Sequence, residues 1–214
     1  MNPTIGLISV TSVDIEEHAH ALMHSQHKME KAGIKVSDVC LVTHQRPWDF
    51  KGRLVQLSHP MDILSYARFQ VRKMPQVIET DFIINIQADG FVTNASKWTD
   101  DFLKYDYIGA PWKEPKGKNG ARVGNSGFSL RSNTWMTRSS APYLEMNLHC
   151  RIPYDDEGDD VFWTQIDTEW MGHLRIAPLE LATRFSIEQD IPEAPGRTVH
   201  DCFGCHARGK VRKQ

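Results

Sequence analysis

A short apolar run that ends in a carboxylate constrains the fold of this chain more than any other feature. Residues 82–86 read Phe-Ile-Ile-Asn-Ile, and residues 87–90 follow as Gln-Ala-Asp-Gly. A run of this length that is rich in β-branched side chains is typical of a strand buried on both faces of a parallel sheet. Asp89 would then lie at the carboxyl-terminal edge of the sheet, where open α/β sheets bind their ligands.

The segments before this run alternate between strand and helix patterns. Residues 4–13 and 36–43 have strand composition, and residues 18–31 carry apolar side chains at helical spacing. A second helix is predicted over residues 62–74, closed by Pro75. A strand, helix, strand order is the opening of a parallel sheet. We therefore expect an α/β fold with a mixed, mostly parallel sheet flanked by helices.

The later segments are less regular. Residues 98–105 are predicted to be helical, and residues 113–122, rich in Pro, Gly and basic side chains, are predicted to form a mobile loop. Residues 161–170 have a helical pattern after an acidic turn, and the tail from about residue 208 is basic and expected to be flexible.

Size and composition describe an ordinary globular chain. The 214 residues are expected to form a single domain, with 40% hydrophobic residues, 24% charged residues and a formal net charge of −2. A charge this close to zero gives no general support for binding to nucleic acid. No apolar stretch approaches the ~20 residues of a membrane helix, and the first residues lack a basic leader. The prediction is a cytoplasmic protein without a membrane span.

The cysteines allow two alternative interpretations. Four cysteines are too few for a disulfide framework in a chain of this size, so reduced thiols are expected. Residues 202–206 match the C-x-x-C-H pattern of covalent haem attachment, which we reject because that chemistry requires export and the chain reads as α/β. A zinc site from Cys202, Cys205, His200 and His206 is the more serious alternative, because thiolates and imidazoles are zinc ligands. The protein would then be a non-catalytic zinc- or nucleotide-binding module.

Five short motifs lie before and after the Asp89 turn. They are SYARF at 65–69, DYIGAPW at 106–112, VGNSGFSLR at 123–131, GDDVF at 158–162 and FGCH at 203–206. Over residues 53–206 they resemble an uncharacterised glycosyltransferase-like domain family with DYIGAPW and GNxGFSLR motifs. That family is similar to nucleotide-sugar glycosyltransferases of the GT-A fold.

The resemblance implies transfer of a sugar from a nucleoside-diphosphate-sugar donor to an acceptor hydroxyl. Asp89 looks like the last carboxylate of the DxD motif of GT-A enzymes, and Gln87 stands where the first Asp often lies. His206 falls where many of these enzymes supply a further metal ligand. The implied cofactor is Mn²⁺ or Mg²⁺, which would stabilise the departing nucleoside diphosphate.

The resemblance also implies a catalytic base and a set of donor contacts. Asp159 and Asp160 precede an apolar helical pattern, and Asp160 best matches the base of inverting enzymes. Residues 11–13 would hold the base and ribose, and the glycine-rich turn near Gly127 would approach the sugar. The implied donor-binding residues are Thr11, Ser12, Val13, Arg68, Gln87, Ala88, Asp89, Asn125 and Gly127.

The acceptor stays open at this point. A glycan, a small molecule or a hydroxylated base in modified, phage-type DNA all offer a hydroxyl group. The basic residues of 113–122 and of the tail would supply phosphate contacts in the DNA case.

Overall fold

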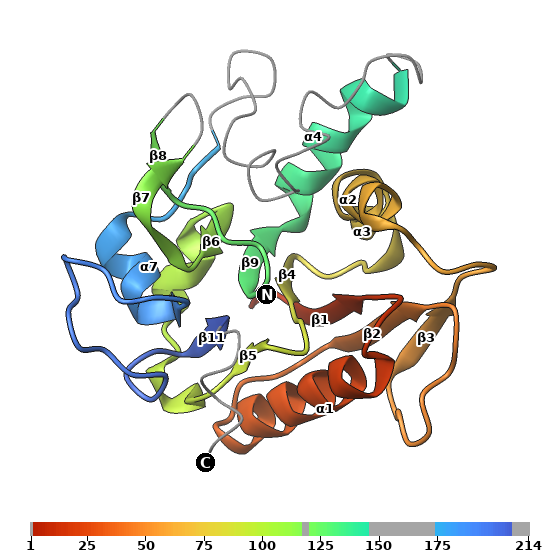
Figure 1. The fold of residues 1–214 in the computed structure, drawn as a ribbon, viewed down its shortest axis with the longest axis horizontal. Helices are drawn as coiled ribbons and strands as arrows, with labels where there is room; N and C mark the ends of the chain where they lie inside the picture. Colours follow the sequence, from red (N-terminus) through yellow and green to blue (C-terminus); the bar gives the residue numbers. More distant parts are fainter. Residues whose placement is uncertain (1, 117–119, 146–173, 207–214) are drawn as a thin grey trace.

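The computed structural model describes residues 2–116, 120–145 and 174–206, and its centre is a six-stranded sheet (Figure 1). The strand order is β3-β2-β1-β4-β9-β6. The first four strands run parallel, and β9 is antiparallel to both β4 and β6. The predicted mixed, mostly parallel sheet is therefore confirmed. The strands are β1 (Ile5–Val10), β2 (Asp38–Thr43), β3 (Arg53–Gln56), β4 (Phe82–Asn85), β6 (Tyr107–Gly109) and β9 (Ser129–Ser132).

Two smaller sheets complete the strands of the described residues. In the first, β11 (Gly204–His206) lies between β10 (Ser186–Ile187) and β5 (Gly90–Val92). In the second, β7 (Pro111–Lys116) pairs with β8 (Ala121–Val123) as an antiparallel hairpin. The expectation of a loop over residues 113–122 is therefore wrong for most of that segment. Pro115 lies within β7, and the hairpin has an irregular register between Pro111 and Lys116.

Helices cover both faces of the central sheet. Helix α1 (Ile15–Lys31) lies on one face, and α2 (Ile63–Arg72), α3 (Met74–Val77) and α4 (Asn133–Glu145) lie on the other (Figure 1). The short helix α7 (Leu179–Phe185) packs beside β6.

The predicted helix boundaries are corrected at three places. Helix α1 begins at Ile15, three residues before the predicted start. The segment 62–74 divides into α2, whose start is capped by the Asp62 side chain, and α3, which has Pro75 in its first turn. Residues 98–105 contain a 3-10 helix over Asp100–Lys104, after another over Ala95–Lys97, rather than an α-helix.

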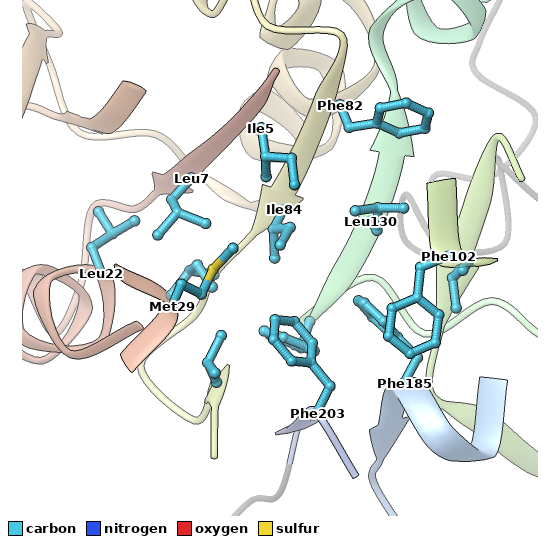
Figure 2. Close-up of a cluster of buried hydrophobic side chains, with 14 of the residues drawn as sticks. Ile5, Leu7, Leu22, Met29, Phe82, Ile84, Phe102, Leu130, Phe185 and Phe203 are labelled. Carbon is cyan, nitrogen blue, oxygen red and sulfur yellow. The ribbon is translucent and has the colours of Figure 1, made fainter. Parts of the chain in front are cut away.

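The central strand β4 is buried on both faces. Ile84 joins the core beneath α1, together with Leu22 and Met29 (Figure 2), whereas Ile83 joins the core beneath α2 to α4. Side chains of a strand alternate between faces, so apolar residues are needed at both odd and even positions; Asn85, the one polar residue of β4, is buried too. Phe102, Phe128, Phe185 and Phe203 extend the first core toward α7 and β11.

Two further predictions concern membranes and the undescribed segments. Among the described residues, no helix has the length and apolar character needed to cross a membrane. The helix predicted over 161–170 and the tail from 208 lie outside the described residues.

Candidate functional site

The chain reverses direction immediately after the central strand. The backbone N–H of Gln87 donates to the carbonyl of Gly90 at 2.9 Å, and the N–H of Gly90 donates back to Gln87 at 3.0 Å. Ala88 and Asp89 therefore form the tip of a tight turn between β4 and β5. Strand alternation does not extend to Asp89, so the turn determines how the Asp89 and Gln87 side chains lie.

Strand β11 brings His206 to this turn from the far end of the described chain. Because β11 runs antiparallel to β5, His206 is paired with Gly90. The His206 Nε2 atom lies 3.4 Å from Asp89 Oδ1 and 3.2 Å from Gln87 Oε1. The Gln87 amide also donates to the Tyr66 hydroxyl of α2 at 2.8 Å. Three of the residues expected to bind metal thus converge on one point.

Glu188 faces the other side of the same imidazole. Its Oε1 atom lies 3.7 Å from His206 Nδ1. Burial alone would lower the pKa of His206, but the carboxylates of Asp89 and Glu188 outweigh burial and raise that pKa to about 9. His206 is therefore protonated on both ring nitrogens and positively charged at neutral pH. A cation bound at Nε2 would have to displace the proton on that nitrogen.

A glycine makes room for the imidazole. A Cβ atom at Gly127 would lie 2.2 Å from His206 Nε2, and a Cβ atom at Gly90 would lie 2.5 Å from the Gly127 carbonyl oxygen. Such distances are impossible for non-bonded atoms, so the turn that precedes β9 can pack against His206 only without side chains at these positions. Gly127 therefore shapes the site, and its contact with a sugar stays a prediction.

Buried polar groups hold the turn that contains Gly127. Asn125 Oδ1 accepts a hydrogen bond from the Gly127 N–H at 3.0 Å, so this oxygen stabilises the turn. The Asn85 amide donates to the Ser126 carbonyl at 2.8 Å. The fully buried Arg131 donates to the same carbonyl at 3.4 Å and to Gln70 of α2 at 3.0 Å.

The end of β1 supplies the residues expected to hold a nucleotide. The Thr11 hydroxyl accepts a hydrogen bond from the Val13 N–H at 3.1 Å, and the Ser12 hydroxyl accepts one from the Met61 N–H at 2.7 Å. Val13 is 69% exposed and Asp14 adopts a left-handed conformation with φ of 46°. Ser12 thus ties the segment before α2 to the edge of the sheet, and Val13 presents an open apolar surface there.

His18, which was not predicted to be a site residue, is buried beside this edge. His18 Nδ1 is 2.7 Å from the Ser9 hydroxyl, and both side chains are buried. Burial lowers the pKa of His18 to about 4, against the opposing effect of Asp14, Asp89 and Glu17. His18 is therefore neutral in the folded protein. His18 lies on the buried face of α1, three and four residues before Ala21 and Leu22, so its helical spacing was a signal of burial that the prediction did not use.

The neutral state of His18 predicts a loss of stability in mild acid. Below pH 6.5 the unfolded chain binds a proton at His18 that the folded chain does not bind until the pH nears 4. Between pH 7 and pH 5 this difference removes about 2 kcal/mol of stability. Urea unfolding of wild type and His18→Gln at the two pH values measures it. A variant whose stability falls as steeply as that of wild type would contradict the assignment; the exposed His20→Gln serves as the control.

The remaining predicted site residues are not brought to the turn by any described contact. Arg68 is exposed on α2, and no described hydrogen bond or ion pair joins it to Asp89. Asp159 and Asp160 lie outside the described residues. Their predicted roles remain predictions. Neither Glu188 nor Tyr66 was predicted to be a site residue. No sequence pattern marks Glu188, and Tyr66 lies in the SYARF motif, where no role was assigned to it.

A family model described as a protein of unknown function (DUF5672) matches residues 61–206. The chain belongs to the DUF5672 family. No curated protein matches it in sequence.

Two solved structures share the fold of this DUF5672 chain. A glycosyltransferase involved in glycosylation of the major capsid of PBCV-1 is 12% identical, with a TM-score of 0.57 covering 98% of this chain and 95% of that one. The galactosyltransferase LgtC, in complex with donor and acceptor sugar analogues, is 11% identical, with a TM-score of 0.54 covering 96% and 87%. The expected GT-A-like fold is therefore confirmed.

A third match is longer than this DUF5672 chain. The glycosyltransferase GlyE of Streptococcus pneumoniae TIGR4 is 13% identical with a TM-score of 0.48, covering 82% of this chain and 45% of that one. The chain thus spans less than half the length of GlyE.

The donor atoms at the turn fit a divalent cation. Asp89 offers a carboxylate, His206 an imidazole and Gln87 an amide oxygen, a set suited to Mn²⁺ or Mg²⁺ when phosphate oxygens complete it. Glu188 on the opposite ring nitrogen resembles the carboxylate that orients many metal-bound imidazoles. Among the described residues, no three His, Cys, Asp or Glu side chains are grouped to hold a metal. A cation here would therefore need Gln87 and the oxygens of its ligand.

The zinc alternative is wrong for this DUF5672 chain. His200, Cys202, Cys205 and His206 are all described, and they form no metal-binding group. Cys202 Sγ donates instead to the carbonyl of Thr183 at 3.2 Å. Burial raises the pKa of the Cys205 thiol to about 11 and also raises that of Cys202, so both thiols stay protonated.

Proposed function

We propose that this protein is a glycosyltransferase that moves a sugar from a nucleoside-diphosphate-sugar donor to an acceptor hydroxyl. The convergence of Asp89, Gln87 and His206 at the end of β4 carries the proposal. It lies at the edge where open α/β sheets bind ligands, in a fold shared with two glycosyltransferases. A fold alone supports many activities, so the side chains at the turn are the stronger argument.

The turn would hold the diphosphate of the donor through a cation. Asp89, His206 and the Gln87 oxygen would bind Mn²⁺ or Mg²⁺, which when bound supplies Lewis-acid stabilisation of the departing nucleoside diphosphate. Tyr66 fixes the Gln87 amide by accepting from its nitrogen, which turns the amide oxygen toward His206. Glu188 stabilises a proton at His206 Nδ1, which leaves Nε2 for the cation.

The open end of β1 would hold the nucleoside. Val13 is exposed there, and Ser12 anchors the segment that leads into α2. An aromatic surface stands nearby, because the backbone N–H of Trp48 donates to Glu16 in the first turn of α1 at 3.0 Å and Trp48 is 94% exposed. Apolar and aromatic surface of this kind suits a nucleobase.

A panel of nucleoside-diphosphate sugars tests the function. Purified protein with Mn²⁺ or Mg²⁺ should release nucleoside diphosphate from at least one donor, and faster when a hydroxyl acceptor is present. Chelation with EDTA should abolish the release. Tight binding of a donor with no release toward any acceptor would instead identify a non-catalytic nucleotide-binding module.

The proposed base is tested by a matched pair of substitutions. Asp160→Asn removes a carboxylate that would accept the acceptor proton, and such a loss costs about 10² to 10⁴-fold in transfer. Asp159→Asn makes the same chemical change one residue away and should have a much smaller effect. Donor binding, followed by calorimetry, should be unchanged in both. Equal activity of the two variants would reject Asp160 as the base.

A further inference from the structure

A hollow lies next to Glu188, one of the residues around the candidate site. Its volume is about 540 Å³, within the usual range for small-molecule sites. The second half of α1, strand β5 and residues 187–200 form its walls. Gln87, Asp89 and His206 do not line it, so it is distinct from the proposed donor site. Glu188 lines the hollow and also faces His206.

The charges of the lining balance. Lys28 and Arg197 oppose Glu188 and Asp190, which gives a formal charge of zero when the histidines are neutral. A surface that alternates hydrogen-bond donors and acceptors without net charge suits a neutral ligand with many hydroxyl groups, because each hydroxyl both donates and accepts.

The charged side chains are held in place by the backbone. Lys28 Nζ donates to the Thr93 carbonyl at 2.9 Å, and Arg197 Nη1 donates to the Thr183 carbonyl at 2.6 Å. Asp190 Oδ1 accepts from the Gly196 N–H at 3.0 Å. Each group uses only part of its hydrogen-bonding capacity in these contacts. Polar groups fixed in this way are ready to bind without a large loss of side-chain entropy.

An aromatic pair contributes apolar surface to the same hollow. Phe91 of β5 is half-buried, and its ring meets His24 of α1 edge to face with centroids 5.6 Å apart. Burial lowers the pKa of His24, which favours its neutral form. The aromatic rings can contact the C–H face of a sugar ring, and the polar groups around them can bind its hydroxyls.

We propose that this hollow is a second saccharide site, which holds a neutral sugar unit of a glycan acceptor away from the reacting hydroxyl. The proposal rests on the proposed function for its assignment to an acceptor, whereas binding of a neutral saccharide stands on the hollow itself. Binding at a site away from the reaction would raise the affinity for an extended acceptor by linking two contacts.

Two substitutions test the site without touching the proposed donor residues. Gln189 and His200 line the hollow, and their side chains make no hydrogen bond or ion pair with other described residues. Gln189→Trp should fill part of the hollow, and His200→Ala should remove a polar contact. The probes are lactose, maltose, cellobiose and diacetylchitobiose, titrated by calorimetry and by protein-observed NMR.

At least one disaccharide should bind wild type with a Kd on the order of 1 mM. Its affinity should be unchanged in Asp89→Asn and should fall about tenfold or more in Gln189→Trp. Absence of binding by all four sugars, or binding lost in Asp89→Asn but kept in Gln189→Trp, would overturn the proposal. Displacement of the sugar by inorganic phosphate at a lower concentration would also overturn it, in favour of an anion site.

Donor hydrolysis separates this proposal from the function itself. Gln189→Trp should hydrolyse a nucleoside-diphosphate sugar at the wild-type rate. If wild type hydrolyses no donor but binds a disaccharide, the proposed function is rejected and the saccharide site is kept. Normal hydrolysis without disaccharide binding would reject the saccharide site alone.

Discussion

Gly127→Ala is expected to abolish most of the activity while leaving a folded protein. The new methyl group would lie 2.2 Å from His206 Nε2, so the imidazole or the turn must move. Overpacking of this kind costs about 1–3 kcal/mol of stability. Displacement of a metal or diphosphate ligand by about 1 Å lowers a rate by about 10²-fold. Donor hydrolysis and thermal unfolding of the same preparation measure the two effects.

Gly33→Ala is the matched control for this substitution. Gly33 has φ of +80°, and a Cβ atom there would have no neighbour within 4 Å. Alanine at such a position loses about 1–2 kcal/mol through backbone strain. The control should therefore lose similar stability and keep its activity. Wild-type hydrolysis by Gly127→Ala would show that the contact between Gly127 and His206 does not shape the active site.

Asp89→Asn is the second substitution with a large expected effect. It keeps the size of the side chain and removes the charge that faces His206 at 3.4 Å. The loss of a ligand carboxylate should lower donor hydrolysis by about 10² to 10³-fold, since Lewis-acid stabilisation of a leaving group contributes several kcal/mol. The pKa of His206 should also fall, because Asp89 contributes to raising it. NMR titration of the imidazole reports this second change independently of turnover.

Asp49→Asn is the matched control, because it removes an exposed carboxylate that pairs with Lys51 at the surface. It should change neither donor hydrolysis nor the pKa of His206. Glu188→Gln should have an intermediate effect on activity, about 10 to 100-fold, because it acts on the metal only through the imidazole. An Asp89→Asn protein with normal hydrolysis and an unchanged His206 pKa would remove Asp89 from the site.

The sequence predicts the central sheet and its functional edge because local pattern dictates both. Residues 82–84 and 86 are apolar, and a strand covered on both faces needs apolar side chains at both odd and even positions. Asp89 and His206 were proposed as partners from the resemblance, and the pairing of His206 with Gly90 in β11 and β5 brings them together. The hairpin β7–β8 was missed because the Pro and Gly residues that mark loops also occur where strands turn.

Other parts of the site depend on packing that has no local signature. Glu188 contacts His206 only because β10 lies beside β11 in a parallel pair. His18 shares the buried face of α1 with Ala21 and Leu22, but its contact with Ser9 exists only because α1 packs over β1. The four residues of the zinc alternative are not assembled around one point: Cys205 and His206 lie in β11, whereas the Cys202 thiol, before that strand, donates to the Thr183 carbonyl.

A crystal structure of the protein soaked with Mn²⁺ and a hydrolysis-resistant nucleoside-diphosphate sugar tests the central claim most directly. We expect one cation bound by Asp89 and His206, with oxygen ligands at about 2.1 Å that include the diphosphate. The nucleoside should lie over residues 11–13. A cation or diphosphate bound elsewhere, with the Asp89 and His206 side chains still in contact with each other alone, would contradict the account.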